Sequence, residues 1–144
     1  MKACDDMGSA LEQWLIAWDE HDLDGVMALF AEDAIFESWS GSRIAGRERI
    51  RAAWHDWFAA EPPFRFEREA LLIDERAGEA VYAWRYEGPA LDEAQGARIE
   101  RRRGIDLIRF EDGLIAEKTT YTKTVLERDG GRVTLRPVPP GGRS

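Results

Sequence analysis

The spacing of apolar residues changes once along this chain, near Phe64, and no other feature limits the possible folds as strongly. Before this point apolar residues lie three or four positions apart, which is typical of helices with one buried face. After it they alternate with polar residues, which is typical of strands. A chain of 144 residues is long enough for one domain. The order of the two patterns therefore predicts a single α+β domain, with helices packed on one face of a curved, mainly antiparallel sheet.

Three helices and one short strand are predicted before Phe64. In the first helix, Leu11, Trp14 and Trp18 share one face. Pro62-Pro63 stops the third helix, because proline cannot continue it. The predicted segments are a helix over residues 10–18 with Ser9 as its N-cap, a helix from its cap Asp22 to residues 31–33, a strand over 34–39, a loop over 41–46 and a helix over 46–60.

Four strands are predicted from Phe64 onward, joined by turns that contain glycine. They cover residues 64–74, 79–88, 97–110 and 114–126. We take residues 1–126 as a single domain and residues 127–144 as a C-terminal tail rich in Gly, Pro and Arg. The tail is predicted to be irregular or dependent on a partner, with one β-like piece over 132–136.

Charge and composition argue against several classes of function. The net charge of −8 argues against nucleic-acid binding, and we interpret the basic run Arg101-Arg102-Arg103 as a solvated strand end. The single cysteine, Cys4, excludes a disulfide framework and a metal cluster built on cysteines. No HxH or HExxH motif indicates a metal site, and no Gly-rich loop indicates a phosphate site. We therefore expect no metal and no cofactor.

The chain also lacks a recognisable targeting segment. No apolar run reaches the length of a signal-peptide core or of a membrane span. We therefore expect a soluble, cytoplasmic protein without a membrane partner.

Alternation assigns the side chains of the last strands to the two faces of the sheet. Three aromatic residues share the face that is predicted to point at the helices, namely Tyr82, Trp84 and Tyr86. A three-residue Glu111-Asp112-Gly113 loop would close the final hairpin. The predicted pairs are Phe110 with Leu114, Ile108 with Ala116, and Asp106 with Lys118. This register places Asp106 and Lys118 on the inner face.

An inward Asp106 has two interpretations. In the functional one, apolar surroundings keep it a neutral acid that donates a hydrogen bond to, or exchanges a proton with, a bound carbonyl or enol. In the structural one it is ionised and paired with Lys118 or an arginine. Lys118 is likewise open: it either polarises a substrate oxygen and balances Asp106, or reaches solvent from a strand edge.

Three stretches carry a resemblance to a known family: LFAEDAIFES after the second helix, IAGRERIRAAW at the start of the third, and GIDLIRFEDGLIAEKTTY near the end. With the order of helices and strands, they make residues 9–126 similar to the NTF2-like superfamily, closest to its SnoaL-like and ketosteroid-isomerase-like enzymes. The resemblance implies a cone-shaped domain that encloses one deep apolar pocket, and a homodimer formed through the sheet face.

The resemblance also implies positions for catalytic residues. The strand aspartate that ketosteroid isomerases use matches Asp106. Their tyrosine position falls at Trp14 and their base position at Ser38, so their own proton-transfer route is not expected here, since serine cannot act as a carboxylate base. The final-strand carboxylate of limonene-epoxide-hydrolase-like enzymes falls at Thr120.

Two functions are predicted. The first is a cofactor-independent isomerase, cyclase or lyase that acts on a hydrophobic cyclic or aromatic carbonyl compound, with Asp106 as its acid-base group. The second is a non-catalytic dimeric module that binds an apolar ligand or a protein partner. The predicted pocket residues are Trp14, Trp18, Ser38, Trp54, Trp57, Tyr82, Trp84, Tyr86, Ile108, Lys118, Thr120 and Thr122. The outward residues expected to pack against a partner sheet are Ile105, Leu107, Ile115 and Tyr121.

Overall fold

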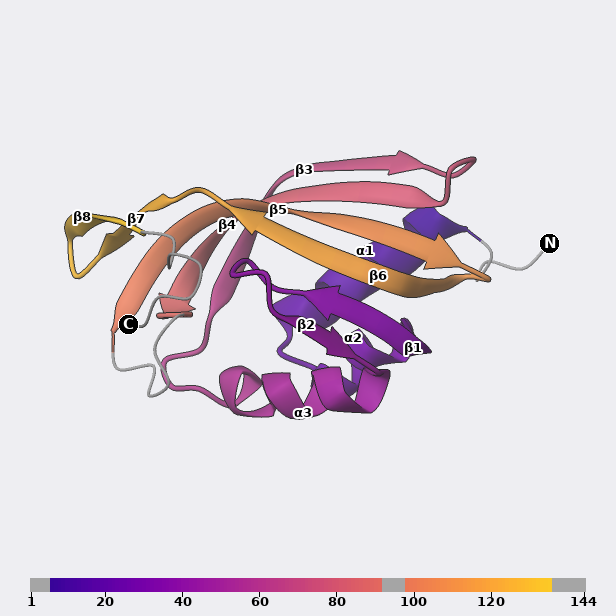
Figure 1. The fold of residues 1–144 in the computed structure, drawn as a ribbon, viewed down its shortest axis with the longest axis horizontal. Helices are drawn as coiled ribbons and strands as arrows, with labels where there is room; N and C mark the ends of the chain where they lie inside the picture. Colours follow the sequence, from indigo (N-terminus) through magenta and orange to yellow (C-terminus); the bar gives the residue numbers. More distant parts are fainter. Residues whose placement is uncertain (1–5, 92–97, 136–144) are drawn as a thin grey trace, which may run out of the picture.

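The structure is a computed structural model that describes residues 6–91 and 98–135 (Figure 1). Its helices are α1 (Met7–Asp19), α2 (Leu23–Ala28) and α3 (Arg47–Phe58). Its strands are β1 (Phe30–Glu37), β2 (Arg43–Ala45), β3 (Arg65–Asp74), β4 (Glu79–Pro89), β5 (Ile99–Glu111), β6 (Leu114–Thr122), β7 (Val125–Arg128) and β8 (Gly131–Thr134). Cys4 and the end of the predicted tail, residues 136–144, lie outside the described ranges.

The strands of the described part form one sheet in the order β2-β1-β6-β5-β4-β3, with β7 paired to β5 and β8 paired to β7. The β1–β6 pair is parallel, and the other described pairs are antiparallel. The sheet curls over α1, and α3 lies beside β1 and β2 on the same concave side (Figure 1). The predicted fold class is confirmed: helices on one face of a curved, mainly antiparallel sheet, with the cone shape that the resemblance implies.

The N-cap of α1 is Asp6, which corrects the predicted cap at Ser9. The Gly8 backbone N–H donates to Asp6 Oδ1 at 2.9 Å, and the Ser9 hydroxyl donates to Asp6 Oδ2 at 3.1 Å. An aspartate upstream satisfies the first free N–H groups, so the helix begins earlier than predicted. Asp22 caps α2 as predicted, accepting from the Gly25 N–H at 3.0 Å.

The region between α2 and α3 differs from the prediction in two ways. α2 ends early, at Ala28, because Phe30 belongs to β1 and pairs with Ile115 in the middle of the sheet. The predicted loop before α3 contains β2, because the Ser38 N–H donates to the Ser42 carbonyl at 2.8 Å and closes a β1–β2 hairpin. In both places long-range pairing overrides the local pattern.

The register of the β5–β6 hairpin also differs from the prediction. Asp106 pairs with Thr120, and Lys118 pairs with Ile108. The turn has two central residues, Asp112 (φ 54°) and Gly113 (φ 81°), which shifts the pairing by one position. A bulge opposite Arg109 and Phe110 adds a second shift. Two shifts together preserve the face, so Asp106 and Lys118 point inward as predicted.

The two-residue turn moves Ile115 to the inner face, opposite Phe110. Ile115 was predicted to lie outward, but it is fully buried, and its N–H donates to the Leu29 carbonyl at 2.8 Å. Ile105, Leu107 and Tyr121 do lie outward and are 39, 38 and 53% exposed. The outward apolar residues are therefore Ile105, Leu107 and Tyr121, without Ile115.

Strand structure continues past residue 126, where an irregular tail was predicted. β7 crosses this point and pairs with β5, and Leu126 is buried. The Arg128 guanidinium donates to the buried Glu100 carboxylate at 2.9 Å, which holds β7 against β5. The predicted β-like piece over 132–136 overlaps β8 at residues 132–134.

Aromatic packing fills the inside of the cone. The Trp18 ring lies 5.0–5.9 Å, between ring centroids, from several other rings, those of Trp14, Trp54, Trp57, Phe58, Phe64 and Phe66. Gly104 in β5 lets a further ring approach, because a Cβ there would lie 2.6 Å from Trp84 Cη2 and 2.4 Å from the Tyr121 carbonyl oxygen. Trp84 can therefore lie across the sheet. No helix in the part of the chain described here has the length and apolar character needed to cross a membrane.

Candidate functional site

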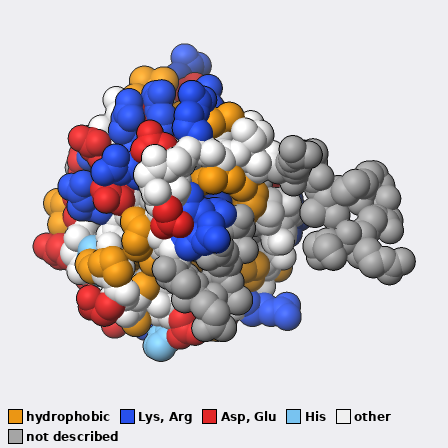
Figure 2. Space-filling view, turned by 90° about the vertical axis from the view of Figure 1, so that its left-hand side faces the viewer, with side chains coloured by type: hydrophobic (Ala, Val, Ile, Leu, Met, Phe, Trp, Pro, Cys, Tyr) orange, Lys and Arg blue, Asp and Glu red, His pale blue; other side chains and the backbone are white. Residues whose placement is uncertain are grey.

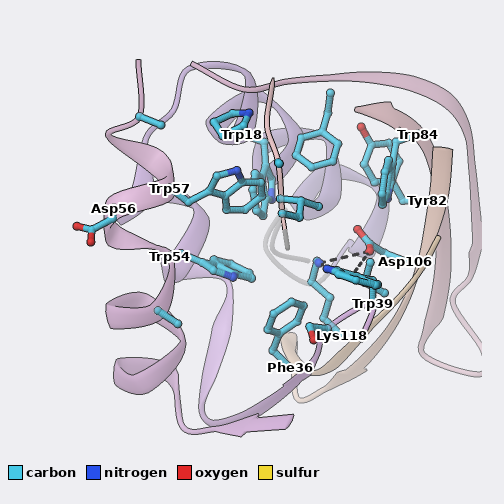
Figure 3. A pocket seen from close by; sticks show the side chains of 18 of the residues that line it. Trp18, Phe36, Trp39, Trp54, Asp56, Trp57, Tyr82, Trp84, Asp106 and Lys118 are labelled. Carbon is cyan, nitrogen blue, oxygen red and sulfur yellow. Dashed lines mark hydrogen bonds and ion pairs between the residues drawn. The ribbon is translucent and has the colours of Figure 1, made fainter. Parts of the chain in front are cut away.

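A cavity of about 590 Å³ opens between the helices and the inner face of the sheet (Figure 3). Every layer of the fold contributes to its wall: Trp18 from α1, Trp54 from α3, Phe36 from β1, and residues of β3 to β6. The residues that line it are Trp18, Phe36, Ser38, Trp39, Ala53, Trp54, Asp56, Trp57, Ala60, Glu61, Phe66, Tyr82, Trp84, Pro89, Ala90, Leu91, Asp106, Lys118 and Thr120. The size and aromatic lining suit a small, mainly apolar ligand.

Asp106, Lys118 and Thr120 form a connected polar group on the sheet side of this cavity. The Thr120 hydroxyl donates to Asp106 Oδ1 at 2.7 Å, and Lys118 Nζ lies 3.3 Å from the same oxygen. Lys118 Nζ also donates to Thr120 Oγ1 at 3.0 Å. The carboxylate comes from β5 and the other two groups from β6, so the hairpin register creates the group. We call these three residues the polar triad.

The other surroundings of Lys118 are aromatic. Its Nζ lies 4.7 Å from the centroid of the Phe36 ring and 5.5 Å from that of Trp54. The residue is 5% exposed. Burial lowers the pKa of the Lys118 amine, and the nearby Asp106 carboxylate opposes that change in part. The ring faces also attract the ammonium form. Lys118 is therefore a buried amine held between an apolar environment and one carboxylate.

Tyr82 is the cross-strand neighbour of Asp106 and stays a neutral phenol. Burial is the main cause that raises the pKa of Tyr82, and the Asp106 carboxylate raises it further. The Tyr86 hydroxyl, in contrast, is already occupied, because it donates to the Pro89 carbonyl at 2.7 Å and accepts from Trp57 Nε1 at 3.1 Å. Tyr82 is thus the tyrosine placed to meet a ligand.

Two indole N–H groups in the cavity wall have no acceptor among the described residues. They belong to Trp18, which is 6% exposed, and Trp84, which is 2% exposed. A buried donor without a partner is destabilising by about 1–3 kcal/mol, so native proteins rarely keep one without a reason. An acceptor oxygen on a bound ligand would satisfy either group.

A family model for the SnoaL-like domain matches residues 11–118. The chain belongs to the SnoaL-like domain family. No curated protein matches it. Solved structures with the same fold include an NTF2-like protein of unknown function from Mesorhizobium loti, which is 26% identical with a TM-score of 0.65, the match covering 85% of this chain and 95% of that one.

Two further structures show how varied proteins with this fold are. SalBIII, an epoxide hydrolase/cyclase-like enzyme in pyran ring formation in polyether salinomycin, is 16% identical with a TM-score of 0.67, and the match covers 81% of this chain and 89% of that one. A computationally designed 17-OHP binder is 19% identical with a TM-score of 0.68, and the match covers 85% and 95% of the two chains. At such identity the likeness concerns the fold alone.

Eight of the twelve predicted pocket residues line the cavity of this SnoaL-like domain, together with the predicted acid-base residue Asp106: Trp18, Ser38, Trp54, Trp57, Tyr82, Trp84, Lys118 and Thr120. Four lie outside its lining. Trp14 donates its indole N–H to the Val26 carbonyl at 3.0 Å, deep in the core. Tyr86 is held by Pro89, and Ile108 is fully buried under the sheet. Thr122 lies beyond the triad, where β6 pairs with Gly104.

Sequence reasoning missed several lining residues. Phe36 lies two residues before the predicted inward residue Ser38, so the alternation of that strand could have found it. Ala53 lies four residues before the predicted pocket residue Trp57, so the helical period could have found it. The other missed residues lie on loops, near the ends of elements or, in the case of Phe66, on a strand whose faces were not assigned. The missed residues are Phe36, Trp39, Ala53, Asp56, Ala60, Glu61, Phe66, Pro89, Ala90 and Leu91.

A second buried ionic group supports the wall near Trp39. The Arg102 guanidinium donates to Glu100, and its centre lies 4.5 Å from the Trp39 ring centroid. Glu100 also accepts from the Leu91 N–H at 3.0 Å. Arg102 is 2% exposed, which corrects the prediction of a wholly solvated basic run. The buried group therefore positions two lining residues, Trp39 and Leu91.

The neighbours of Arg102 in that run, Arg101 and Arg103, are exposed and paired with acids. Arg101 lies 3.9 Å from Glu87, and Arg103 lies 3.2 Å from Glu69. On the end of the molecule where β7 and β8 lie, basic and acidic side chains alternate over the surface (Figure 2). No group of three or more His, Cys, Asp or Glu within residues 6–91 and 98–135 is arranged to hold a metal ion.

Proposed function

We propose that this SnoaL-like domain is an enzyme of the isomerase, cyclase or lyase class, in which Asp106 moves a proton on a hydrophobic cyclic or aromatic carbonyl compound. The observation that carries the proposal is the polar triad at the wall of an aromatic cavity, where Asp106 has one hydroxyl and one ammonium bound to a single oxygen. Both of these contacts use Oδ1, and in this proposal the other oxygen, Oδ2, serves the ligand.

The geometry supports a role for Asp106 as a base. In this role the Asp106 carboxylate accepts a proton from a carbon next to the ligand's carbonyl, while Lys118 lies 3.3 Å from its Oδ1. The negative charge then develops on the carbonyl oxygen, where the Lys118 ammonium or a free indole N–H stabilises it. Thr120 holds the carboxylate in one orientation. The protonated Asp106 can return the proton to another atom of the ligand.

A second candidate is a non-catalytic module that binds an apolar ligand. It is favoured by the observation that the charges of the polar triad balance each other without any ligand. A designed 17-OHP binder also has this fold. Under this second function, ligands without a carbonyl group would bind as tightly as ligands with one.

Fluorescence titration with planar phenols, which mimic a dienol intermediate, tests the first proposal. We expect micromolar affinity, with quenching of the tryptophans that line the cavity. Asp106→Asn should weaken binding by about tenfold, or about 1.4 kcal/mol, because the phenol loses an anionic acceptor. Asp56→Asn is the matched control, since Asp56 lines the same cavity but lies outside the triad.

Two results would contradict the enzyme proposal. One is equal phenol affinity in the Asp106→Asn variant and the unchanged protein. The other is equal loss in the Asp56→Asn control, since that loss would come from a general change in charge at the cavity. Either result would leave the triad a structural ion pair and favour the non-catalytic function.

A further inference from the structure

Lys118 differs from the other two lysines of the chain, Lys2 and Lys123, in a way that matters for chemistry. Its Nζ lines the cavity and is buried, whereas Lys123 is exposed at the end of β6 and Lys2 lies outside the described residues. Two oxygens contact the Lys118 amine, and the rest of its surroundings are ring faces. A primary amine in an apolar pocket is a nucleophile towards carbonyl carbon once it is neutral.

We propose that Lys118 forms an imine with an apolar aldehyde or ketone bound in the cavity, with Asp106 as the proton carrier. This inference rests on the proposed function, because it uses the same ligand class and the same Asp106. The inference goes beyond the proposed function because the ligand becomes covalently bound to Lys118. The Lys118 nitrogen, and not only its charge, then takes part.

The steps balance with the groups present. The Lys118 ammonium passes a proton across the 3.3 Å contact to Asp106, which leaves an amine and a carboxylic acid. The amine nitrogen bonds to the carbonyl carbon, and transfer of a proton from nitrogen to oxygen gives a neutral carbinolamine. Asp106 then protonates the hydroxyl, which leaves as water, and a protonated imine remains beside the Asp106 carboxylate. The net change joins ammonium and carbonyl to give protonated imine and water.

The electrostatics of the site favour this sequence. The protonated imine carries one positive charge, as the ammonium does, so the buried Asp106 carboxylate keeps a counter-charge at the end. Burial lowers the pKa of Lys118 and so makes its neutral amine accessible. Aromatic walls at Phe36 and Trp54 suit an apolar substituent on the carbonyl carbon. The imine would also make the neighbouring C–H more acidic, and the Asp106 carboxylate lies beside it to take that proton.

Reductive trapping tests the proposal directly. The protein is incubated with 2-naphthaldehyde and sodium cyanoborohydride, which delivers hydride to the imine carbon and leaves a stable secondary amine. Intact mass and peptide mapping then locate the adduct. We expect Lys118 to be modified about tenfold or more faster than Lys123, because its amine lines the cavity that holds the aldehyde and burial lowers the pKa of Lys118. Lys123→Arg should change nothing at Lys118.

Variants of the polar triad test separately the role of Lys118 as nucleophile and the role of Asp106 as proton carrier. Lys118→Arg keeps a positive charge beside Asp106 but cannot form an imine, so the pocket adduct should vanish. Asp106→Asn should slow trapping at Lys118 by about a hundredfold, the lower end of the contribution of acid-base catalysis. Glycolaldehyde, which is polar, should label Lys118 no faster than Lys123.

The outcomes distinguish this inference from the function on which it rests. Quenching of tryptophan fluorescence by 2-naphthaldehyde without an adduct at Lys118 would overturn the imine, and the phenol titration would still decide the acid-base function. Trapping that Asp106→Asn does not slow would overturn the assigned proton carrier. If 2-naphthaldehyde gives neither quenching nor an adduct, the cavity does not accept aromatic carbonyl compounds, and both proposals fail.

Discussion

At the scale of single residues, Asp106 combines one feature from each of its two interpretations, the pairing with Lys118 and the position at the cavity wall. It is paired with Lys118, as the structural interpretation expects, and both side chains are 7% exposed. Yet both line the cavity, as the functional interpretation expects. Lys118 does not reach solvent from the strand edge. An ion pair in the cavity wall can also contact a bound ligand through the atoms that face the cavity.

Breaking this pair should lower stability. Lys118→Met leaves the Asp106 carboxylate buried without a counter-charge, and we expect a loss of about 3–5 kcal/mol in the free energy of unfolding. The double variant Lys118→Met with Asp106→Leu should recover most of this loss, because no charge is left buried. Urea unfolding measures all three proteins. Lys123→Met, on the surface, should stay within about 0.5 kcal/mol. A Lys118→Met variant as stable as that control would contradict the prediction.

The lowered pKa of Lys118 predicts a pH dependence. The folded state holds this proton less tightly than the unfolded state, whose amine has the ordinary value of 10.5. Between the two values the unfolded state binds more protons, so the unfolding free energy should rise with pH through that window. Asp106 faces the amine directly, Tyr82 lies across the sheet from Asp106, and Asp56 and Glu61 line the same cavity.

The Lys118→Met variant isolates this contribution, because it retains those neighbours but lacks the amine. The stability of the unchanged protein relative to that variant should increase from pH 7 towards pH 10.5. Effects of the tyrosines at alkaline pH occur in both proteins and cancel in the difference. Urea unfolding at several pH values gives the comparison. A relative stability that is flat or falls over this range would show that the proton is not held less tightly in the folded state.

At the scale of elements, the β5–β6 hairpin decides what the site contains. Its two-residue turn and its bulge each shift the register by one position, which brings Asp106 opposite Thr120 and leaves Lys118 two pairs away, opposite Ile108. If the bulge were absent and the turn unchanged, the residues of one strand that now face inward would face outward. The chemistry of the cavity therefore depends on backbone irregularities as well as on residue identity.

Gly104 is the position in this hairpin where a single methyl group should matter. Gly104→Ala places a Cβ 2.4 Å from the Tyr121 carbonyl oxygen and 2.6 Å from the Trp84 ring. We expect a loss of about 1–3 kcal/mol from overpacking, and weaker phenol binding because Trp84 must shift. Gly131→Ala is the matched control, since the closest atom to its Cβ would be 3.8 Å away. Equal stability of the two variants in urea would contradict the prediction.

At the scale of the whole molecule, the outer face of the sheet remains to be explained. Ile105, Leu107 and Tyr121 expose between 38 and 53% of their surfaces on neighbouring strands. The resemblance to the NTF2-like superfamily implies a homodimer through this face, and we propose that two copies pack here. Such an interface would be self-complementary about a two-fold axis.

Light scattering at micromolar concentration tests the dimer. The measured mass should be twice the 16.4 kDa of one chain. Leu107→Glu should shift the protein to monomer, because it places a charge in the middle of the apolar set. Ile16→Glu serves as control, since Ile16 is also exposed but lies on helix α1 and not on the sheet. A monomeric unchanged protein would contradict the proposal.

The sequence by itself determined the order of the three helices and the long strands, the inner face of β4 and the inward direction of Asp106 and Lys118. These features follow from local periodicity, which any window of the chain carries. The aromatic face of β4 is an example, since Tyr82, Trp84 and Tyr86 are all buried. The family resemblance came from the same short stretches.

Only the tertiary structure decided which of these side chains meet. Thr120 binds Asp106 because a turn and a bulge set the register. Arg102 is buried beside Glu100 of its own strand, and Arg128 of β7 donates to the same carboxylate. Trp14 lies outside the cavity lining because its indole N–H donates to the Val26 carbonyl, twelve residues along the chain. Each of these outcomes depends on contacts between segments far apart in the chain, and local periodicity carries no information about such contacts.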